Sequence, residues 1–297
     1  MIPNQAADMH FKQYKSILSP QNGMNIYRGC THGCIYCDSR SKCYQMDHDF
    51  EDIEVKTNAP EMLEAALKSR RKKCMISTGA MTDPYIPLEY KLMYTRRCLE
   101  IIDNYGFGIA IQTKSNRILR DLDLLKSINE KTKCVVQMTL TTFDENLCRI
   151  IEPNVCTTME RYEVLKRMRD AGIPTVVWLC PLLPFINDTE ENLRGILDYC
   201  FEAKVYGILN FGIGVTLREG DRDYFYKKLA EHFPGLKARY QRKYGYSYEV
   251  RSDNNDKLME IYKKECSKRG IVCNNDEIFQ YMHTYVERQQ PGQLSFI

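Results

Sequence analysis

Six short segments rich in β-branched and aromatic residues alternate with segments of helical character, and this alternation constrains the fold most. The predicted strands are residues 24–28, 73–78, 107–112, 133–140, 174–180 and 206–212. Strands that alternate with helices form parallel βαβ units joined by right-handed crossovers. Six such units predict an α/β fold, a partial (β/α)6 barrel rather than a closed eight-stranded one. An open doubly wound sheet is the structural alternative.

The intervening helices carry start and stop signals. Three pairs of residues at i, i+3 have the capping-box pattern, in which a short polar side chain and a glutamate satisfy the first backbone amides: Asn58 with Glu61, Thr157 with Glu160, and Asp188 with Glu191. Another helix is indicated by apolar residues at helical spacing, with a glycine where a helix would end: Leu88, Leu92, Leu99, Ile102 and Gly106. These signals support the strand–helix alternation.

The alternation stops near residue 216, which divides the chain into three parts. Residues 1–23 form an N-terminal segment, residues 24–215 the partial barrel, and residues 216–297 a mainly helical C-terminal extension that ends in a short free tail. Helices are predicted over residues 221–232, 254–269 and 275–288. We expect the extension to pack on the barrel because no long linker separates the two.

Composition sets the compartment and the range of partners. A formal net charge of +3 is too small to demand an acidic partner, so any nucleic-acid surface would be a local patch. The first 16 residues are polar, and the longest apolar run is interrupted by Pro181 and Pro184. The sequence therefore predicts a cytoplasmic protein that does not enter a membrane. Because the cytoplasm is reducing, the 13 cysteines favour metal binding or plain burial over disulfides.

Three cysteines directly follow the first predicted strand. Cys30, Cys34 and Cys37 stand in a C-x3-C-x2-C arrangement on one loop. Thiolates suit iron–sulfur clusters, and this spacing lets three sulfurs reach three corners of a cubane and leaves the fourth iron open to a ligand. The alternatives are a structural zinc loop or a four-cysteine cluster with Cys43 as the nearby fourth ligand.

This motif, with Tyr36 before its last cysteine, resembles the signature of the radical S-adenosylmethionine (SAM) superfamily. The resemblance implies a partial (β/α)6 barrel that holds a [4Fe–4S] cluster on Cys30, Cys34 and Cys37. It also implies that the open iron chelates SAM and that SAM is cleaved to a 5′-deoxyadenosyl radical. In such enzymes the cofactors supply the difficult chemistry, while the protein positions them.

Functional residues of a barrel gather at the carboxyl ends of its strands. That rule selects Thr78 and Gly79 after the second predicted strand, Lys114 after the third, Thr139 and Thr141 at the fourth, and Cys180 at the fifth. The run from Thr82 to Glu89, together with Lys114 and Glu152-Pro153, is similar to the spore photoproduct lyase-like branch. This similarity implies that Thr82 and Lys114 hold SAM and that Thr139 or Thr141 contacts its ribose.

The sequence departs from that branch at two points. Residues 77–80 replace the Gly-Gly-Glu-type element of the superfamily, and Ala80 or Met81 stands where the lyase has its hydrogen-donating cysteine. The departures predict a relative that keeps the SAM machinery and changes the substrate chemistry. Cys180 and Cys43 are the candidate replacement donors.

The predicted function is a radical SAM enzyme with an unknown substrate. Nucleic acid, and with it DNA repair, is one candidate, and a peptide or a small molecule is the alternative. An external electron donor of the flavodoxin or ferredoxin type is implied. The basic and aromatic residues 237–246 could contact nucleic acid or form an amphipathic surface. The tail from Gln293 to Ile297 resembles a peptide that docks onto the bacterial sliding clamp. The opposing hypothesis is an iron–sulfur electron carrier or nucleic-acid-binding protein without SAM chemistry.

Overall fold

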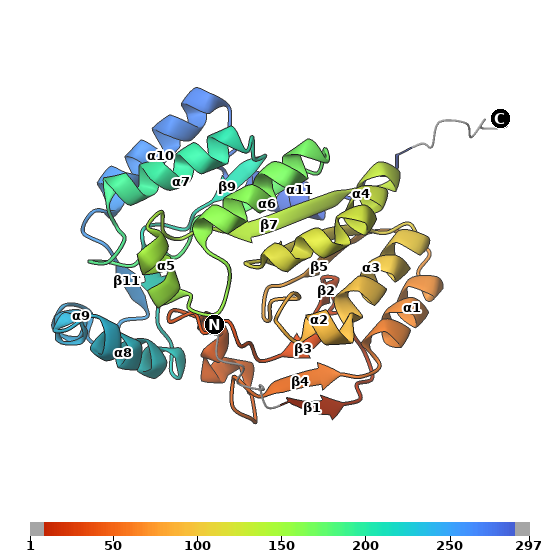
Figure 1. The fold of residues 1–297 in the computed structure, drawn as a ribbon, viewed down its shortest axis with the longest axis horizontal. Helices are drawn as coiled ribbons and strands as arrows, with labels where there is room; N and C mark the ends of the chain where they lie inside the picture. The colour runs from red at the N-terminus through yellow and green to blue at the C-terminus, as the bar shows by residue number, and fades with distance from the viewer. Residues whose placement is uncertain (1–8, 289–297) are drawn as a thin grey trace.

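A six-stranded parallel sheet forms the centre of the computed structural model, which describes residues 9–288 (Figure 1). Its strands follow the chain order: β2 (Gly23–Met24), β5 (Met75–Thr78), β6 (Gly108–Thr113), β7 (Cys134–Thr139), β8 (Thr175–Trp178) and β9 (Gly207–Leu209). A doubly wound sheet would reverse direction at a switch point. The sequential order therefore confirms the partial barrel and excludes the open alternative.

Helices connect the strands and cover the outer face of the sheet (Figure 1). They are α1 (Ala59–Ser69), α2 (Glu89–Leu92), α3 (Tyr94–Asn104), α4 (Leu122–Lys131), α5 (Glu145–Ile151), α6 (Thr158–Asp170) and α7 (Glu190–Glu202). Alternate strand residues such as Ile76, Ile109 and Val136 belong to the largest buried cluster, together with apolar residues of these helices. Their neighbours Met75, Ala110 and Val135 face the barrel interior in a second cluster.

The first predicted strand is divided between two sheets, which corrects the sequence expectation. Of the predicted residues 24–28, only Met24 belongs to β2, which pairs with β5. Tyr27 and Arg28 form β3, which pairs with β4 (Ile53–Lys56) instead. β4 also pairs in parallel with β1 (Met9–Lys12), so part of the N-terminal segment belongs to a small sheet ordered β1-β4-β3. Such short strands of mixed polarity carry little periodic signal.

The helix starts show one confirmed capping box and two corrections. Thr157 and Glu160 form the predicted box at α6. The Asn58 side chain instead holds the backbone of Tyr14 through two hydrogen bonds of 2.8 and 3.0 Å. α7 is capped by Thr189, one residue after the predicted Asp188. Asp188 is used elsewhere, because it accepts a hydrogen bond from Ser252 of the C-terminal extension.

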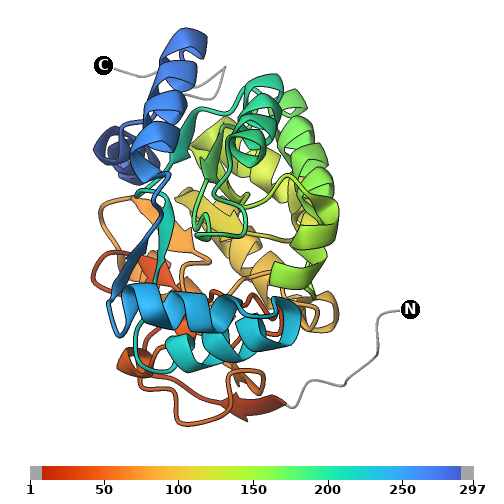
Figure 2. The same ribbon diagram turned by 90° about the vertical axis from the view of Figure 1, so that its left-hand side faces the viewer.

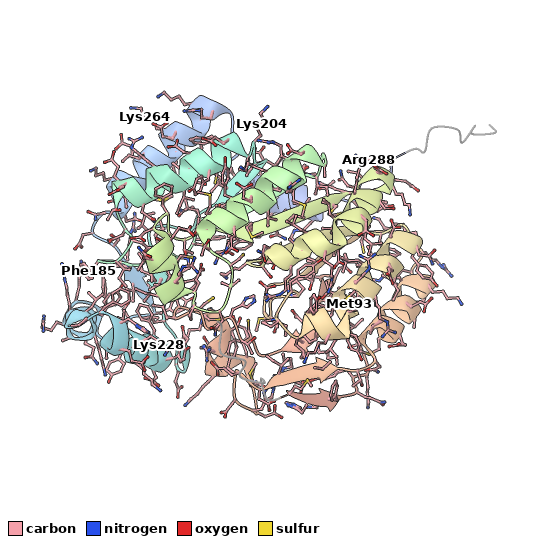
Figure 3. The ribbon with its side chains drawn as sticks, in the orientation of Figure 1. Met93, Phe185, Lys204, Lys228, Lys264 and Arg288 are labelled. Carbon is pink, nitrogen blue, oxygen red and sulfur yellow. The ribbon has the colours of Figure 1, made fainter. Side chains whose placement is uncertain are left out.

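The predicted helix over residues 88–105 is interrupted at Met93, which has a φ of 57° and separates α2 from α3 (Figure 3). Gly106 then follows α3 with a φ of 66°, as a residue after a helix end commonly does. The interruption changes the direction of the chain after the Thr82–Glu89 run. This left-handed residue gives no periodic signal in the sequence.

The C-terminal extension has four helices and a two-stranded antiparallel sheet. The helices are α8 (Asp221–His232), α9 (Leu236–Tyr244), α10 (Asn255–Arg269) and α11 (Asn275–His283), and the strands are β10 (Gly214–Thr216) and β11 (Glu249–Arg251). α11 ends five residues before the predicted helix end at residue 288. Figure 2 shows α8 and α9 at one end of the molecule and α10 at the other.

The extension packs on the barrel at more than one place. Ile278 and Met282 of α11 join the inner-face cluster that contains Met75 and Val135. Val272 bridges to Gly207 of the last barrel strand. Within residues 9–288, no helix combines the length and apolarity needed to cross a membrane.

Candidate active site

The loop that carries Cys30, Cys34 and Cys37 is fixed to the segment between α5 and α6. The amide of Ile35 donates to the Ile151 carbonyl at 3.0 Å, and Asn154 donates to the carbonyls of His32 and Thr31 at 3.1 and 3.0 Å. Gly33 has a φ of 71°, and an added Cβ would lie only 3.1 Å from Pro153. A glycine permits both this conformation and this close approach.

A fully buried ion pair lies beneath that loop. Arg161 of α6 and Glu152 are 2.6 Å apart, and neither side chain is exposed. The Tyr36 hydroxyl donates to the same carboxylate, and Arg161 also donates to the carbonyls of Thr139 and Cys156. Burial raises the pKa of Glu152, but Arg161 and Lys114 outweigh it and hold that pKa below its usual range. Glu152 is therefore ionised, and the network joins the cysteine loop to strand β7 and helix α6.

Asp83 fastens the end of β5 to the end of β6. Its carboxylate accepts hydrogen bonds from the Thr113 hydroxyl and the Lys114 amide, both at 2.7 Å. It also accepts from the Tyr85 amide at 2.8 Å. Gly79, just before this turn, has a φ of 99°, and an added Cβ would lie 2.0 Å from the Gln112 carbonyl oxygen. These contacts fix the backbone from which Lys114 projects.

A cavity of about 1330 Å³ opens at the carboxyl ends of the strands, between the barrel and the C-terminal extension. From the barrel it is lined by Cys34, Tyr36, Cys37, Ala80, Lys114 and Cys180. From the extension it is lined by residues of β10, β11 and α10 and by residues 273–276. Two cysteines of the motif and the predicted lysine therefore share one cavity.

The three cysteine thiols are free, with Cys30 and Cys34 buried and Cys37 half-buried. A tetrahedral zinc site with bonds of about 2.3 Å would bring its sulfurs within about 4 Å of one another. Among residues 9–288, the groups whose ligand atoms all lie within 4.8 Å are both centred on His48, and the three thiols are not such a group. At least one pair of these sulfurs is therefore more than 4.8 Å apart, which is wider than a tetrahedral zinc site requires.

Charge at the site suits an anionic group. Burial lowers the pKa of Lys114, but Cys34 and Glu152 nearby outweigh it, so the net pKa is raised and the amine is a cation. Its Nζ lies 5.8 Å from the centroid of the Tyr36 ring. Burial raises the pKa of Cys30 to about 12, helped by Cys37 and Asp83. Metal coordination reverses this because it deprotonates the thiol.

The other predicted site residues lie at different depths. Thr82, Thr139 and Thr141 are buried and are not among the residues that line the cavity. Strand alternation places Thr78 with Ile76 on the helix-covered face, and Ser77 on the inner face instead. Cys43 is exposed and lies 3.3 Å from Arg218, whereas Cys180 lines the cavity.

Three polar groups of predicted site elements lack hydrogen-bond partners within the described residues. One is Nδ2 of Asn210, a buried residue that lines the cavity just after β9. The second is Oγ1 of the predicted residue Thr141, which is buried two residues after β7. The third is Nε2 of His32, within the cysteine motif, whose pKa is lowered to about 4 by burial against the opposing influence of Asp83. Unsatisfied buried donors are costly, so Asn210 is well suited to a ligand in the cavity.

Sequence reasoning missed Arg161 as a site residue. Arg161 interrupts the apolar stripe that Leu165 and Met168 continue at helical spacing, and a charge in a buried stripe is the signal that would have exposed it. The inner face also carries a hydrogen bond of 2.9 Å from the indole of Trp178 to Gln137. That pair is visible only once the strands are in register.

The model of the radical SAM superfamily matches residues 24–197. The chain belongs to the radical SAM superfamily. This membership implies a [4Fe–4S] cluster and SAM as cofactors. The family model ends within α7, so the last barrel strand, β9, and the C-terminal extension lie beyond it.

Similar curated proteins are themselves uncharacterised. A Mycobacterium tuberculosis protein is 30% identical over 228 residues, which cover 74% of this chain and 66% of that protein. A Methanocaldococcus jannaschii protein is 31% identical over 169 residues, which cover 56% of this chain and 62% of that protein. The chain thus spans just under two thirds of the length of these relatives.

Solved structures with a similar fold include spore photoproduct lyases. One, complexed with a dinucleoside spore photoproduct, matches with a TM-score of 0.62 at 12% identity and covers 88% of this chain and 79% of that one. A variant with bound SAM and the same dinucleoside matches with a TM-score of 0.61 at 13% identity, over the same shares. At such identities the likeness concerns the fold alone.

Replacing Glu152 by glutamine should leave the Arg161 guanidinium buried without its counter-ion. Loss of one partner from a buried pair costs about 3–5 kcal/mol. We expect the free energy of unfolding, measured anaerobically by denaturant titration, to fall by about that amount. The matched control is Glu163→Gln on α6, the helix that carries Arg161; its half-exposed carboxylate pairs with Lys166 and contributes about 0.5 kcal/mol. A loss for Glu152→Gln no larger than that of the control would contradict the assigned role.

Proposed function

We propose that the chain binds a [4Fe–4S] cluster through Cys30, Cys34 and Cys37 and reductively cleaves SAM within the cavity. The observation that supports this most is the convergence of Cys34, Cys37 and Lys114 on one cavity at the carboxyl ends of the strands. One electron from an external flavodoxin- or ferredoxin-type donor would break the bond between sulfur and C5′, giving methionine and a 5′-deoxyadenosyl radical. The protein's part is to hold the reactants and to exclude water.

Lys114 is the residue that we propose for the carboxylate of SAM. It is a half-buried cation on a backbone fixed by Asp83, and it faces the cavity beside the motif cysteines. The Asn210 amide, unpartnered within the described part of the chain, is a further donor for the adenosine or the substrate. Thr82, Thr139 and Thr141 remain proposed contacts, although they are buried and do not line the cavity.

The substrate that we propose to test first contains a nucleotide. The cavity of about 1330 Å³ exceeds the usual range for one small ligand, about 300–1,000 Å³, so it has room for a second molecule beside SAM. Phe211 and Tyr248 line it and are exposed, and exposed aromatic rings stack on bases. The dinucleoside bound by a lyase of similar fold makes the same class a reasonable choice.

Helix α9 contributes less to such a surface than its composition indicates. Tyr240 is fully buried, Lys243 pairs with Asp253, and the Arg239 guanidinium lies 3.7 Å from the centroid of the Phe185 ring. These side chains stabilise the packing of the extension, as an amphipathic surface segment would. The proposed docking of Gln293 to Ile297 onto a sliding clamp falls outside the described residues and stays a prediction.

Cys180 is the thiol that we propose as a hydrogen donor to a product radical. It lines the cavity together with Ala80, one of the two residues, Ala80 and Met81, proposed to stand where the related lyase has its donor cysteine. Cys43 is exposed outside that lining and is the natural control. A repair reaction identical to that of the lyase is disfavoured, because the donor would approach from another strand.

Anaerobic reconstitution with iron and sulfide, followed by SAM and a reductant, should yield 5′-deoxyadenosine. Changing Cys30, Cys34 or Cys37 to alanine should abolish both the cluster absorbance and the product, whereas Cys43→Ala should retain both. Nucleosides, oligonucleotides and peptides added in parallel identify the substrate class by faster product formation. An intact cluster that neither binds nor cleaves SAM would favour the electron-carrier hypothesis.

Replacing Lys114 by methionine should remove the cation and keep most of the side-chain volume. We expect the dissociation constant for SAM, measured by equilibrium binding to the reconstituted protein, to rise by about tenfold or more, which corresponds to about 1.4 kcal/mol. Lys126→Met, on the exposed face of α4, is the control and should bind SAM as the wild type does. An unchanged dissociation constant for Lys114→Met, with normal cluster content, would refute the assignment.

A further inference from the structure

A second group of metal-ligating side chains lies behind the cysteine loop, in the small sheet. His10 is on β1, and Glu54 is its register partner on the adjacent strand β4 (Figure 1). His48 and Asp52 come from the loop that precedes β4. One ligand atom each from His10, His48 and Asp52 all lie within 4.8 Å of one another. Asp47, His48 and Glu54 form an overlapping group by the same measure.

The contacts of His48 leave one of its ring nitrogens, Nε2, available to a metal. Its Nδ1 lies 3.0 Å from the Asp49 carbonyl oxygen, which can only accept, so Nδ1 carries the proton. Nε2 is then the ring nitrogen that can bind a metal ion. That atom is buried and has no hydrogen-bond partner within the described residues. Metal-binding histidines characteristically donate their other ring N–H to a carbonyl or carboxylate in this way.

His10 lies between two carboxylates. Its Nδ1 is 3.0 Å from Asp52 Oδ2, and its Nε2 is 3.6 Å from Glu54 Oε2. One carboxylate can therefore share a metal with the imidazole while the other accepts the remaining N–H. The rings of His10 and His48 meet edge to face, with centroids 4.7 Å apart. The His10 side chain is 40% exposed, so it can turn toward a bound ion.

Asp52 is the carboxylate most available as a ligand. Glu54 is already used, because it accepts from the Tyr14 hydroxyl and lies 3.2 Å from Lys12 and 3.9 Å from Arg28. Among its side-chain contacts in the described chain, Asp52 has only the one with His10. Two imidazoles and a carboxylate suit a borderline divalent cation better than magnesium or calcium, which prefer all-oxygen sites.

We propose that His10, His48 and Asp52 bind a divalent transition-metal ion of the zinc class. The site would act as a structural brace for the catalytic loop. The Cys30 amide donates to the Phe50 carbonyl at 2.9 Å, and a Cβ on Gly29 would lie 2.6 Å from that same oxygen. Phe50 stands between His48 and Asp52, so an ion that joins these two side chains to β1 fixes the backbone that positions Cys30.

The test uses the protein with its iron–sulfur cluster in place, so that the motif thiols are already occupied. The protein is incubated anaerobically with zinc chloride and desalted, and zinc and iron are measured by elemental mass spectrometry; competition with a chromophoric chelator gives the affinity. The wild type should retain one zinc per chain in addition to the cluster iron. His48→Gln and His10→Gln should each weaken zinc binding at least about tenfold, the loss that even outer partners of a metal ligand commonly cause.

The matched control is His232→Gln, an exposed histidine at the end of α8 that should leave zinc binding unchanged. Added zinc should also raise the unfolding temperature of the wild type and of the control, but not that of His48→Gln. A wild type that retains no zinc, or a His48→Gln variant that binds it as tightly, overturns the proposal. These readouts do not involve SAM, so they are independent of the proposed reaction.

Discussion

The buried pair of Glu152 and Arg161 is the interaction on which the catalytic end of the barrel depends. Two opposite charges without exposure are tolerated only when every remaining donor and acceptor is satisfied. Here Tyr36 and the carbonyls of Thr139 and Cys156 complete the network. The cysteine loop, strand β7 and helix α6 are thereby held in one arrangement. The loop needs this anchor because β2 and β3 beside it have only two residues each.

The cavity has two walls. One is formed by barrel residues within the superfamily match, and the other by residues beyond it. The barrel supplies the thiols and Lys114, all fixed by backbone and carboxylate contacts. The other wall lies beyond the superfamily match and contains Asn210 and Phe211, which directly follow β9, and Tyr248 of the extension. Function in such folds resides in the site rather than in the architecture. We therefore infer that radical generation follows the superfamily, whereas substrate choice is determined by the second wall.

Much of the barrel could be predicted from the sequence because its signals are local. Apolar periodicity placed the strands, the capping box at Thr157 placed α6, and the spacing of the three cysteines indicated the cluster. Features that depend on distant contacts were not predictable. Asn58 had the letters of a cap but serves Tyr14, and β1 is defined only by its pairing with β4. The orientation of His48 and the unpartnered amide of Asn210 likewise required the assembled structure.

The most direct test of the central claim asks whether SAM binds to the open iron of a cluster held by Cys30, Cys34 and Cys37. The measurement is electron–nuclear double resonance of the reduced cluster, with SAM isotopically labelled in its amino and carboxylate groups. The account predicts hyperfine couplings from both labels, which disappear when unlabelled SAM replaces the labelled compound. A reduced cluster whose spectrum is the same with and without SAM would contradict it.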